Sequence, residues 1–227
     1  MRLSAVYYKG VSYKVKGSGT VLEVHGNCYP KGVPHIRSIL EIEGLDKLTS
    51  LKWLEILGTE ITKIEGLETL TNLEHLFLSA NSIKEISGLE SLTNLRRLDL
   101  GGNQIIEIKG LDTLTNLRSL RLAYNKITEF KELDALAKLR KLDLTSNKIT
   151  EFKGLENLVN LEYLSLEGNP ITSLTGLEKL KKLSNLKEVD LFRTPMPYRA
   201  FKEFEKINAD APFYISQNSE KLISDEY

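Results

Sequence analysis

One spacing, repeated along most of the chain, limits what this sequence can fold into. Leucines recur every 22 residues, and asparagines keep the same step at a fixed offset. The leucine column is Leu51, Leu73, Leu95, Leu117, Leu139 and Leu161, and the asparagine column is Asn81, Asn103, Asn125, Asn147 and Asn169. The unit reads L-x-x-L-x-L-x-x-N-x-I-x-x-I-x-G-L-x-x-L-x-x, and residues 95–105 are a clean example. A period of this length indicates a solenoid in which each unit forms one coil.

The spacing within a unit predicts the structure of each coil. The L-x-L segment alternates between buried and exposed positions, as a β-strand does. A single unit cannot bury its leucines alone, whereas stacked parallel units can. The asparagine stands where the chain leaves the strand, where its amide can bond backbone groups of its own and adjacent coils. We therefore predict an α/β solenoid, right-handed and curved, with parallel strands on its concave face and short helical or 3-10 segments on its convex face.

The pattern extends beyond the regular units at both ends. Residues 186–191 open another unit after a step of 25, so we expect a longer convex helix within residues 179–185. Residues 22–27 match the start of a unit, which Ile39, Ile42, Gly44 and Leu45 complete after an insertion at 28–38. The prediction is about eight parallel strands.

Both ends of such an array need caps, because stacking leaves leucines of the terminal coils uncovered. Alternating apolar residues within 1–18 predict paired strands, a β-rich N-terminal cap. The spacing of Tyr198, Phe201, Phe204 and Ile207 predicts a helix over the last coil. The predicted division is therefore a cap at 1–18, repeats at 19–194, and a helical cap with a polar tail at 195–227.

The repeat resembles the 22-residue class of leucine-rich repeats over about residues 19 to 215. This is the class of the leucine-rich regulatory subunit of type-1 protein phosphatase, and bacterial internalins use a close variant. Tyr198-Arg199, Phe201 and residues 212–215 look like the C-terminal cap of intracellular members, although Ile215-Ser216 stands where that cap usually has leucine and aspartate. The resemblance implies a leucine-rich-repeat solenoid that binds proteins through its concave face.

The repeat also indicates which side chains face out of the concave sheet. They occupy the positions flanking the inward leucines and those just before the asparagine. The candidate binding residues are Trp53, Glu55, Leu57, His75, Phe77, Arg97, Asp99, Arg121, Tyr124, Lys141, Asp143, Tyr163, Glu167, Glu188, Asp190 and Phe192. Trp53, Leu57, His75 and Phe77 form an aromatic end, which the insertion or the N-terminal hairpin could instead cover. The charges between are equally consistent with a self-neutralising solvated face.

Charge and composition argue against several classes of function. Lysine and arginine total 31, as do aspartate and glutamate, so the net charge is zero. This disfavours a nucleic-acid binder, which needs a basic surface, and attachment to an anionic membrane. Cys28 is the single cysteine, and the N-terminal residues are too polar for a signal peptide. We expect a cytoplasmic monomer.

No residue pattern points to catalysis, a metal or a cofactor. His25, Cys28 and His35 have the spacing H-x2-C-x6-H, which lacks a fourth ligand and matches no zinc pattern. The glycines at 17 and 19 lack the spacing and context of a phosphate-binding loop. We therefore expect a non-catalytic protein without cofactors.

Three functions fit these expectations. The first is an intracellular scaffold that holds a protein partner on its concave face, for example a phosphatase or another regulated enzyme. The second is a surface adhesin of the internalin type, which would need a secretion signal and an anchor. The third is a structural subunit of a larger complex. The sequence gives the same candidate surface for each.

Overall fold

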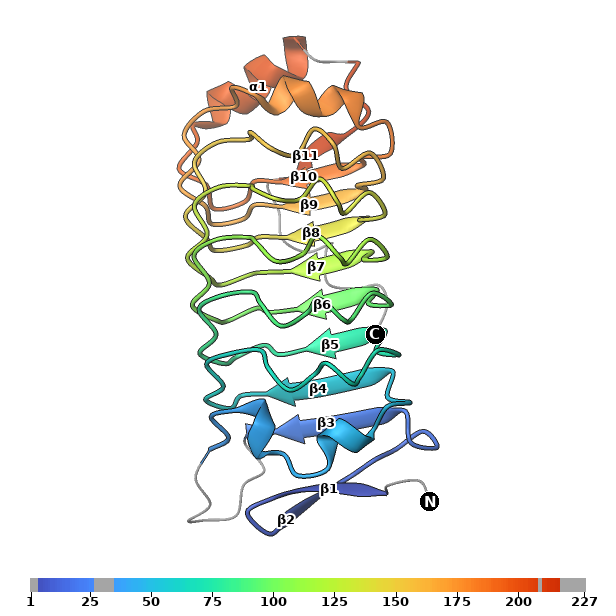
Figure 1. The fold of residues 1–227 in the computed structure, drawn as a ribbon. Helices are drawn as coiled ribbons and strands as arrows, with labels where there is room; N and C mark the ends of the chain where they lie inside the picture. Colours follow the sequence, from blue (N-terminus) through green and yellow to red (C-terminus); the bar gives the residue numbers. More distant parts are fainter. Residues whose placement is uncertain (1–3, 27–34, 208–209, 217–227) are drawn as a thin grey trace.

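The computed structural model describes residues 4–26, 35–207 and 210–216. A parallel sheet of nine strands runs the length of the chain in sequence order (Figure 1). Its strands are β3 (Val21–His25), β4 (Trp53–Leu57), β5 (His75–Phe77), β6 (Arg97–Asp99), β7 (Ser119–Arg121), β8 (Lys141–Asp143), β9 (Tyr163–Ser165), β10 (Glu188–Asp190) and β11 (Tyr214–Ser216). Strands β3 to β10 are the eight strands that the repeat predicts, and the fold is the predicted leucine-rich-repeat solenoid.

The leucine columns form one continuous core. The second residue of each strand from β3 to β10 is buried, and Leu54, Leu76 and Leu98 are directly paired in register. All three are at most 1% exposed. Stacking them removes from water the apolar surface that no single coil could bury.

The buried asparagine column forms a ladder of hydrogen bonds between coils. The side-chain amide of Asn103 donates to the carbonyls of Leu78 in the previous coil and Leu100 in its own, at 3.0 and 2.9 Å. Its oxygen accepts from the backbone N–H of Ile83 at 2.9 Å. The same three kinds of contact recur at Asn125, Asn147 and Asn169. This confirms the role that the sequence assigns to the column.

The segments opposite the sheet are mostly turns. The 3-10 helices there are η2 (Ile39–Glu41), η3 (Leu45–Lys47) and η4 (Leu177–Lys182). Helix η4 lies in the coil with the longer step, although it begins two residues before the predicted range. Most coils place a glycine with positive φ before the convex leucine; at Gly88 a Cβ would lie 2.3 Å from the carbonyl oxygen of Ile64.

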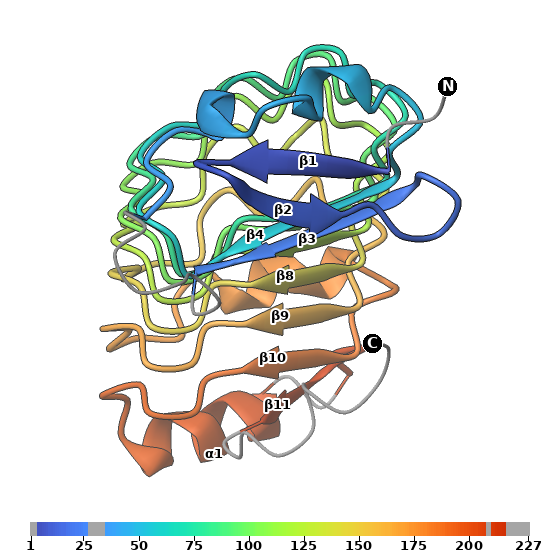
Figure 2. The same ribbon diagram turned by 90° about the horizontal axis from the view of Figure 1, so that it is seen from below.

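The N-terminal strands close one end of the solenoid. Strands β1 (Ala5–Tyr8) and β2 (Val11–Lys14) form an antiparallel hairpin that lies across the first coil (Figure 2). Val6 and Tyr8 are buried, and Tyr7 pairs with Glu43 of the first coil. The hairpin therefore covers the end of the core. The insertion at 28–38 falls largely outside the described residues.

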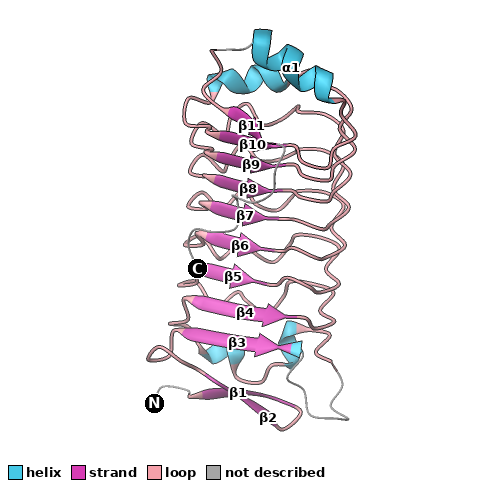
Figure 3. Cartoon of the chain, turned by 180° about the vertical axis from the view of Figure 1, so that it is seen from behind, coloured by secondary structure: helices cyan, strands magenta, loops and turns pink. Residues whose placement is uncertain are grey.

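The C-terminal segment closes the other end. Helix α1 (Tyr198–Ile207) crosses the last coil, and β11 then adds a ninth strand beside β10 (Figures 1 and 3). Phe201 and Phe204 of α1 are buried, whereas Tyr198, expected on the same apolar face, is 63% exposed. Among the described residues no helix has the length and apolar character needed to cross a membrane.

Candidate interaction surface

The outer face of the sheet carries the candidate residues. We define the outer face as the side chains that flank the inward-facing residues of strands β3 to β10, together with the side chains just beyond the end of each strand. Because each strand pairs in register with the next, equivalent positions form columns that cross the sheet. The strands lie side by side, and within the described part of the chain no helix lies over this face (Figure 3).

An aromatic cluster occupies the outer face at β4 and β5. The ring centroids of Trp53 and Phe77 are 4.6 Å apart, and those of Trp53 and His75 are 5.1 Å apart. All three side chains are partly exposed. The structure thus brings together the aromatic residues that the sequence places in neighbouring coils. The hairpin of β1 and β2 lies at the end of the solenoid, beyond β3 (Figure 1).

Two polar atoms within this cluster have no hydrogen-bond partner among the residues that the structure describes. They are the indole Nε1 of Trp53 and Nδ1 of His75, and both are buried. A buried polar group without a partner costs free energy that a bound ligand can recover by supplying one. Burial also lowers the pKa of His75, so its ring is neutral at physiological pH and offers an acceptor as well as a donor.

A hydrogen bond borders the cluster on the side of the first coil. Nε2 of His25 lies 2.5 Å from a carboxylate oxygen of Glu55. Glu55 is a predicted binding residue, and His25 belongs with Cys28 and His35 to the H-x2-C-x6-H spacing, which matches no zinc pattern. Cys28 lies outside the described residues. Within residues 4–26, 35–207 and 210–216, no group of three or more His, Cys, Asp and Glu side chains could hold a metal ion.

A ladder of alternating charge crosses the middle of the outer face. Arg121 contacts Asp99 at 3.6 Å through Nη1 and Asp143 at 3.2 Å through Nε. Each aspartate also accepts a backbone N–H two residues further on, from Gly101 and Thr145 respectively. Burial raises the pKa of Asp99 despite these contacts. These aspartates therefore also stabilise the turns that end β6 and β8.

The outer face differs from the prediction at its C-terminal end. Glu188 and Asp190 are expected to face solvent, but they are only 3% and 1% exposed. The hydroxyl of Tyr214, on the additional strand β11, donates to Glu188 at 2.6 Å. Asp190 accepts the N–H of Phe192 at 2.9 Å, and its neighbour in the sheet is Ser216 of β11. The two carboxylates are therefore not accessible binding surface.

Tyr163 and Phe192 lie in different environments. The ammonium groups of Lys141 and Lys187 lie over the ring of Tyr163, 5.8 and 5.6 Å from its centroid. Phe192 stands beyond the end of β10, with the guanidinium of Arg193 5.2 Å from its ring centroid. They are not one aromatic patch.

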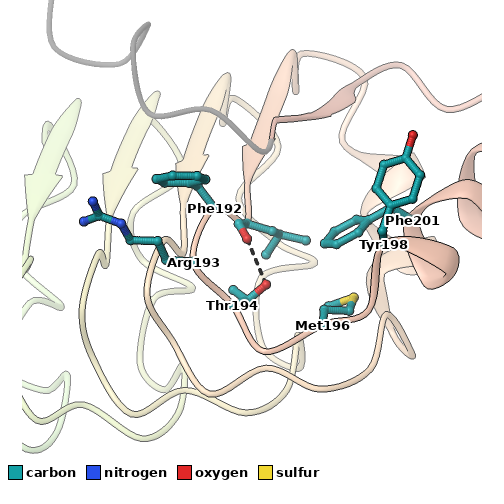
Figure 4. Close-up of a pocket in the computed structure, with 7 residues that line it drawn as sticks. Phe192, Arg193, Thr194, Met196, Tyr198 and Phe201 are labelled. Carbon is teal, nitrogen blue, oxygen red and sulfur yellow. Dashed lines mark hydrogen bonds between the residues drawn. The ribbon is translucent and has the colours of Figure 1, made fainter.

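Phe192 lines a small hollow at the C-terminal end of the solenoid (Figure 4). The hollow is bounded by Leu191, Phe192, Arg193, Thr194, Met196, Tyr198 and Phe201. The hydroxyl of Thr194 donates to the carbonyl of Leu191 at 2.8 Å and fixes the turn between them. This places Phe192 at the junction of the last coil with α1.

The other predicted residues are distributed along the outer face. Tyr124 is 61% exposed and adopts a positive φ of 56° in the turn after β7. Glu167 lies 3.5 Å from Arg193. Leu57, Arg97 and Lys141 are partly or fully exposed.

A second asparagine column was not predicted from the sequence. These asparagines precede the first leucine of each unit, and each donates to a backbone carbonyl of the previous coil. They are Asn72, Asn94, Asn116, Asn160 and Asn185. The recurring dipeptide Thr-Asn before this leucine was a signal in the sequence. Lys138 replaces asparagine in one coil and donates to Asn116 instead.

Comparisons with known proteins agree with this geometry. The family described as leucine-rich repeats (2 copies) matches residues 49–91, 71–114, 93–135, 115–157 and 137–179. The structure is similar to a crystal structure of an internalin C2 from Listeria monocytogenes, with a TM-score of 0.69 and 28% identity, covering 87% of this chain and 80% of the internalin. An internalin from the same organism, inlF, matches at 21% identity with a TM-score of 0.38, covering 91% of this chain and 85% of that one. None of the curated proteins matches this chain in sequence.

Proposed function

Because this chain belongs to the leucine-rich repeat family, whose members generally bind proteins, we propose that it is a non-catalytic scaffold that holds a protein partner on the outer face of its sheet. The observation that carries this proposal is the cluster of Trp53, His75 and Phe77. Partly exposed aromatic rings on a rigid sheet are typical of binding hot spots. The polar atoms of Trp53 and His75 that lack partners add directional groups to the same patch.

The cluster supplies the apolar centre of the interface, and the ladder of Asp99, Arg121 and Asp143 supplies its polar border. Ion pairs that are partly exposed stabilise the fold little, so a partner can exchange with them at low cost. Their alternating sign favours a partner whose own charges alternate, which makes the ladder a source of specificity more than of affinity.

The experiment is a titration that uses Trp53, the single tryptophan of the chain, as an internal probe. A partner is isolated by affinity purification and mass spectrometry, purified, and titrated against this protein while the indole emission is followed. We expect the emission to shift to shorter wavelength, because a partner over the cluster removes water from the indole.

Substitution of three residues on the outer face tests the same site by affinity. We expect Trp53→Ala, Phe77→Ala and Tyr163→Ala together to weaken binding by at least roughly a hundredfold, since a single hot-spot residue contributes about 2 kcal/mol. The matched control replaces Leu40, Ile106 and Val159, which are exposed and lie outside the strands, with alanine. Circular dichroism verifies that each variant is folded. Equal affinities for the two triple variants, measured by calorimetry, would contradict the proposal.

A phosphatase or another regulated enzyme, bound in the cytoplasm by a monomer of this chain, is the partner class that we propose first. Surface recognition of the internalin type is the second candidate, and the similarity to internalin C2 favours it. Fractionation of the native cells separates them. Recovery of the protein with the soluble cytoplasmic enzymes supports the first, and recovery at the cell surface supports the second.

A further inference from the structure

A row of charged side chains runs along one edge of the sheet, separate from the outer face. Its members are the residues that follow the first leucine of each unit, and we call it the leading-edge row. They are Lys52, Glu74, Arg96, Arg118, Arg140, Glu162 and Lys187. The backbone N–H of each, from Glu74 onward, donates to the carbonyl of the preceding member at 2.8 to 2.9 Å. The row is therefore held in register, one residue per coil.

Each carboxylate in this row is shared by two cations. Glu74 contacts Lys52 at 2.8 Å and Arg96 at 3.1 Å, one on each side. Glu162 likewise contacts Arg140 on one side and Lys187, at 2.7 Å, on the other. The hydrogen bonds from these cations lower the pKa of both glutamates, so both are ionised at neutral pH.

Arg118 is left at the centre of the row with its charge uncompensated. Within the described part of the chain its exposed side chain forms no ion pair or hydrogen bond, and its neighbours in the row are Arg96 and Arg140. Neighbouring strands are about 4.8 Å apart, so three arginines stand within roughly 10 Å. Like charges in adjacent strands destabilise the fold unless another group compensates them.

The surroundings of Arg118 add to this positive charge. Lys138, which donates to the amide oxygen of Asn116 at 2.7 Å rather than to a carboxylate, is a further cation beside it. Arg118 and Lys138 both line an open hollow of about 260 Å³. It is lined by Arg118, Lys138, Arg140, Asn160, Glu162 and Asn185. The hollow is large enough for a side chain. Its one carboxylate, Glu162, is already paired with Arg140 and Lys187, and the cations on the lining outnumber it.

We infer that Arg118 is the centre of a second binding site, on the leading edge, that takes a carboxylate side chain from an acidic segment of a protein partner. A guanidinium matches a carboxylate with two parallel hydrogen bonds, and Arg96 and Arg140 favour the same charge. The positive run ends at Glu74 and Glu162, which would repel a continuous phosphate backbone. The site is therefore suited to one or two acidic side chains and not to a nucleic acid.

The test is binding of a fluorescent eight-residue oligoglutamate, measured by anisotropy in low salt. The wild type is compared with Arg118→Gln and with Lys126→Gln, which removes the same charge from an exposed position beyond the opposite end of the same strand. We expect Arg118→Gln to weaken binding roughly tenfold, the loss of one charge-assisted contact, and Lys126→Gln to bind as the wild type does. Arg118→Lys should fall between them, since it keeps the charge without the paired hydrogen bonds.

The inference would be overturned by no binding of the oligoglutamate to the wild type, by equal losses in the two glutamine variants, or by tighter binding of an RNA octamer than of the peptide. The variant with Trp53, Phe77 and Tyr163 replaced by alanine should retain oligoglutamate binding. Loss of the peptide there as well would place its binding on the outer face and contradict a separate site. These measurements therefore test the second site separately from the proposed binding of a partner on the outer face.

Discussion

The carboxylate of Asp190 is buried at the C-terminal end of the sheet, and its pKa is shifted as a result. Burial raises its pKa to about 6, although the N–H of Phe192 donates to it. The nearby carboxylates of Glu167 and Glu188 act in the same direction. In the unfolded chain the pKa is about 3.8. Folding therefore opposes the ionised form of this residue at neutral pH.

The consequence at the residue scale is a pH-dependent effect of Asp190→Asn. Because the folded pKa exceeds the unfolded one, the cost of the charge is present above pH 6 and disappears as the pH falls toward 4. Asparagine keeps the oxygen that accepts from Phe192 without the charge. We expect the substitution to raise the free energy of unfolding by up to about 3 kcal/mol at pH 8 and to have little effect at pH 4. Urea denaturation at both pH values measures this, and equal effects would contradict it.

At the scale of the element, the buried asparagine ladder holds consecutive coils together. Asn103 satisfies three backbone groups that no strand or helix pairs, and these belong to two different coils. The ladder therefore connects the turns of adjacent coils, and the sheet connects their strands. The carbonyls of Leu78 and Leu100 each accept from two successive asparagines, so removing Asn103 leaves the buried N–H of Ile83 without a partner and takes one of two donors from each carbonyl.

We accordingly expect Asn103→Ala to lower the free energy of unfolding by roughly 2 to 4 kcal/mol, because the buried N–H of Ile83 loses its partner and the carbonyls of Leu78 and Leu100 each lose one of two donors. The control is Asn94→Ala in the exposed asparagine column, where the side chain donates one hydrogen bond to the carbonyl of Thr71. It should cost about 1 kcal/mol. Thermal denaturation compares the two, and a control as costly as Asn103→Ala would assign the effect to asparagine in general rather than to its burial.

At the scale of the whole molecule, each coil contacts mainly its neighbours, so stability depends on the ends. The hairpin of β1 and β2 buries Val6 and Tyr8 against the first coil, and α1 buries Phe201 and Phe204 against the last. A solenoid without its cap exposes apolar surface of a terminal coil to water.

Deletion of residues 1–15 should therefore destabilise the coils at the N-terminal end of the solenoid. We expect hydrogen exchange to become faster in β3 and β4 first, while β8 keeps its protection, because stabilisation passes only between adjacent coils. Exchange followed by mass spectrometry locates the change. A uniform loss of protection across the sheet would show instead that the coils unfold as a single unit.

The repeated motif by itself determined the solenoid, eight of the nine strands of its sheet and the buried columns. Each of these positions is dictated within one coil, since a leucine must be buried and an asparagine must satisfy the turn beside it. The aromatic cluster was also predictable in outline, because Trp53, His75 and Phe77 flank inward leucines in adjacent coils. These features need only the repeat and its register.

The tertiary structure decided what each outer side chain contacts. The sequence treats Glu188 and Asp190 like the corresponding residues of other coils, but β11, with Tyr214 near Glu188, makes the last coil different. The sequence likewise gives no reason why Glu74 and Glu162 should each pair with a cation on both sides while Arg118 pairs with no carboxylate of the described residues. Burial of apolar groups follows the period, whereas pairing of charges depends on competition among neighbours in three dimensions, which a repeat does not encode.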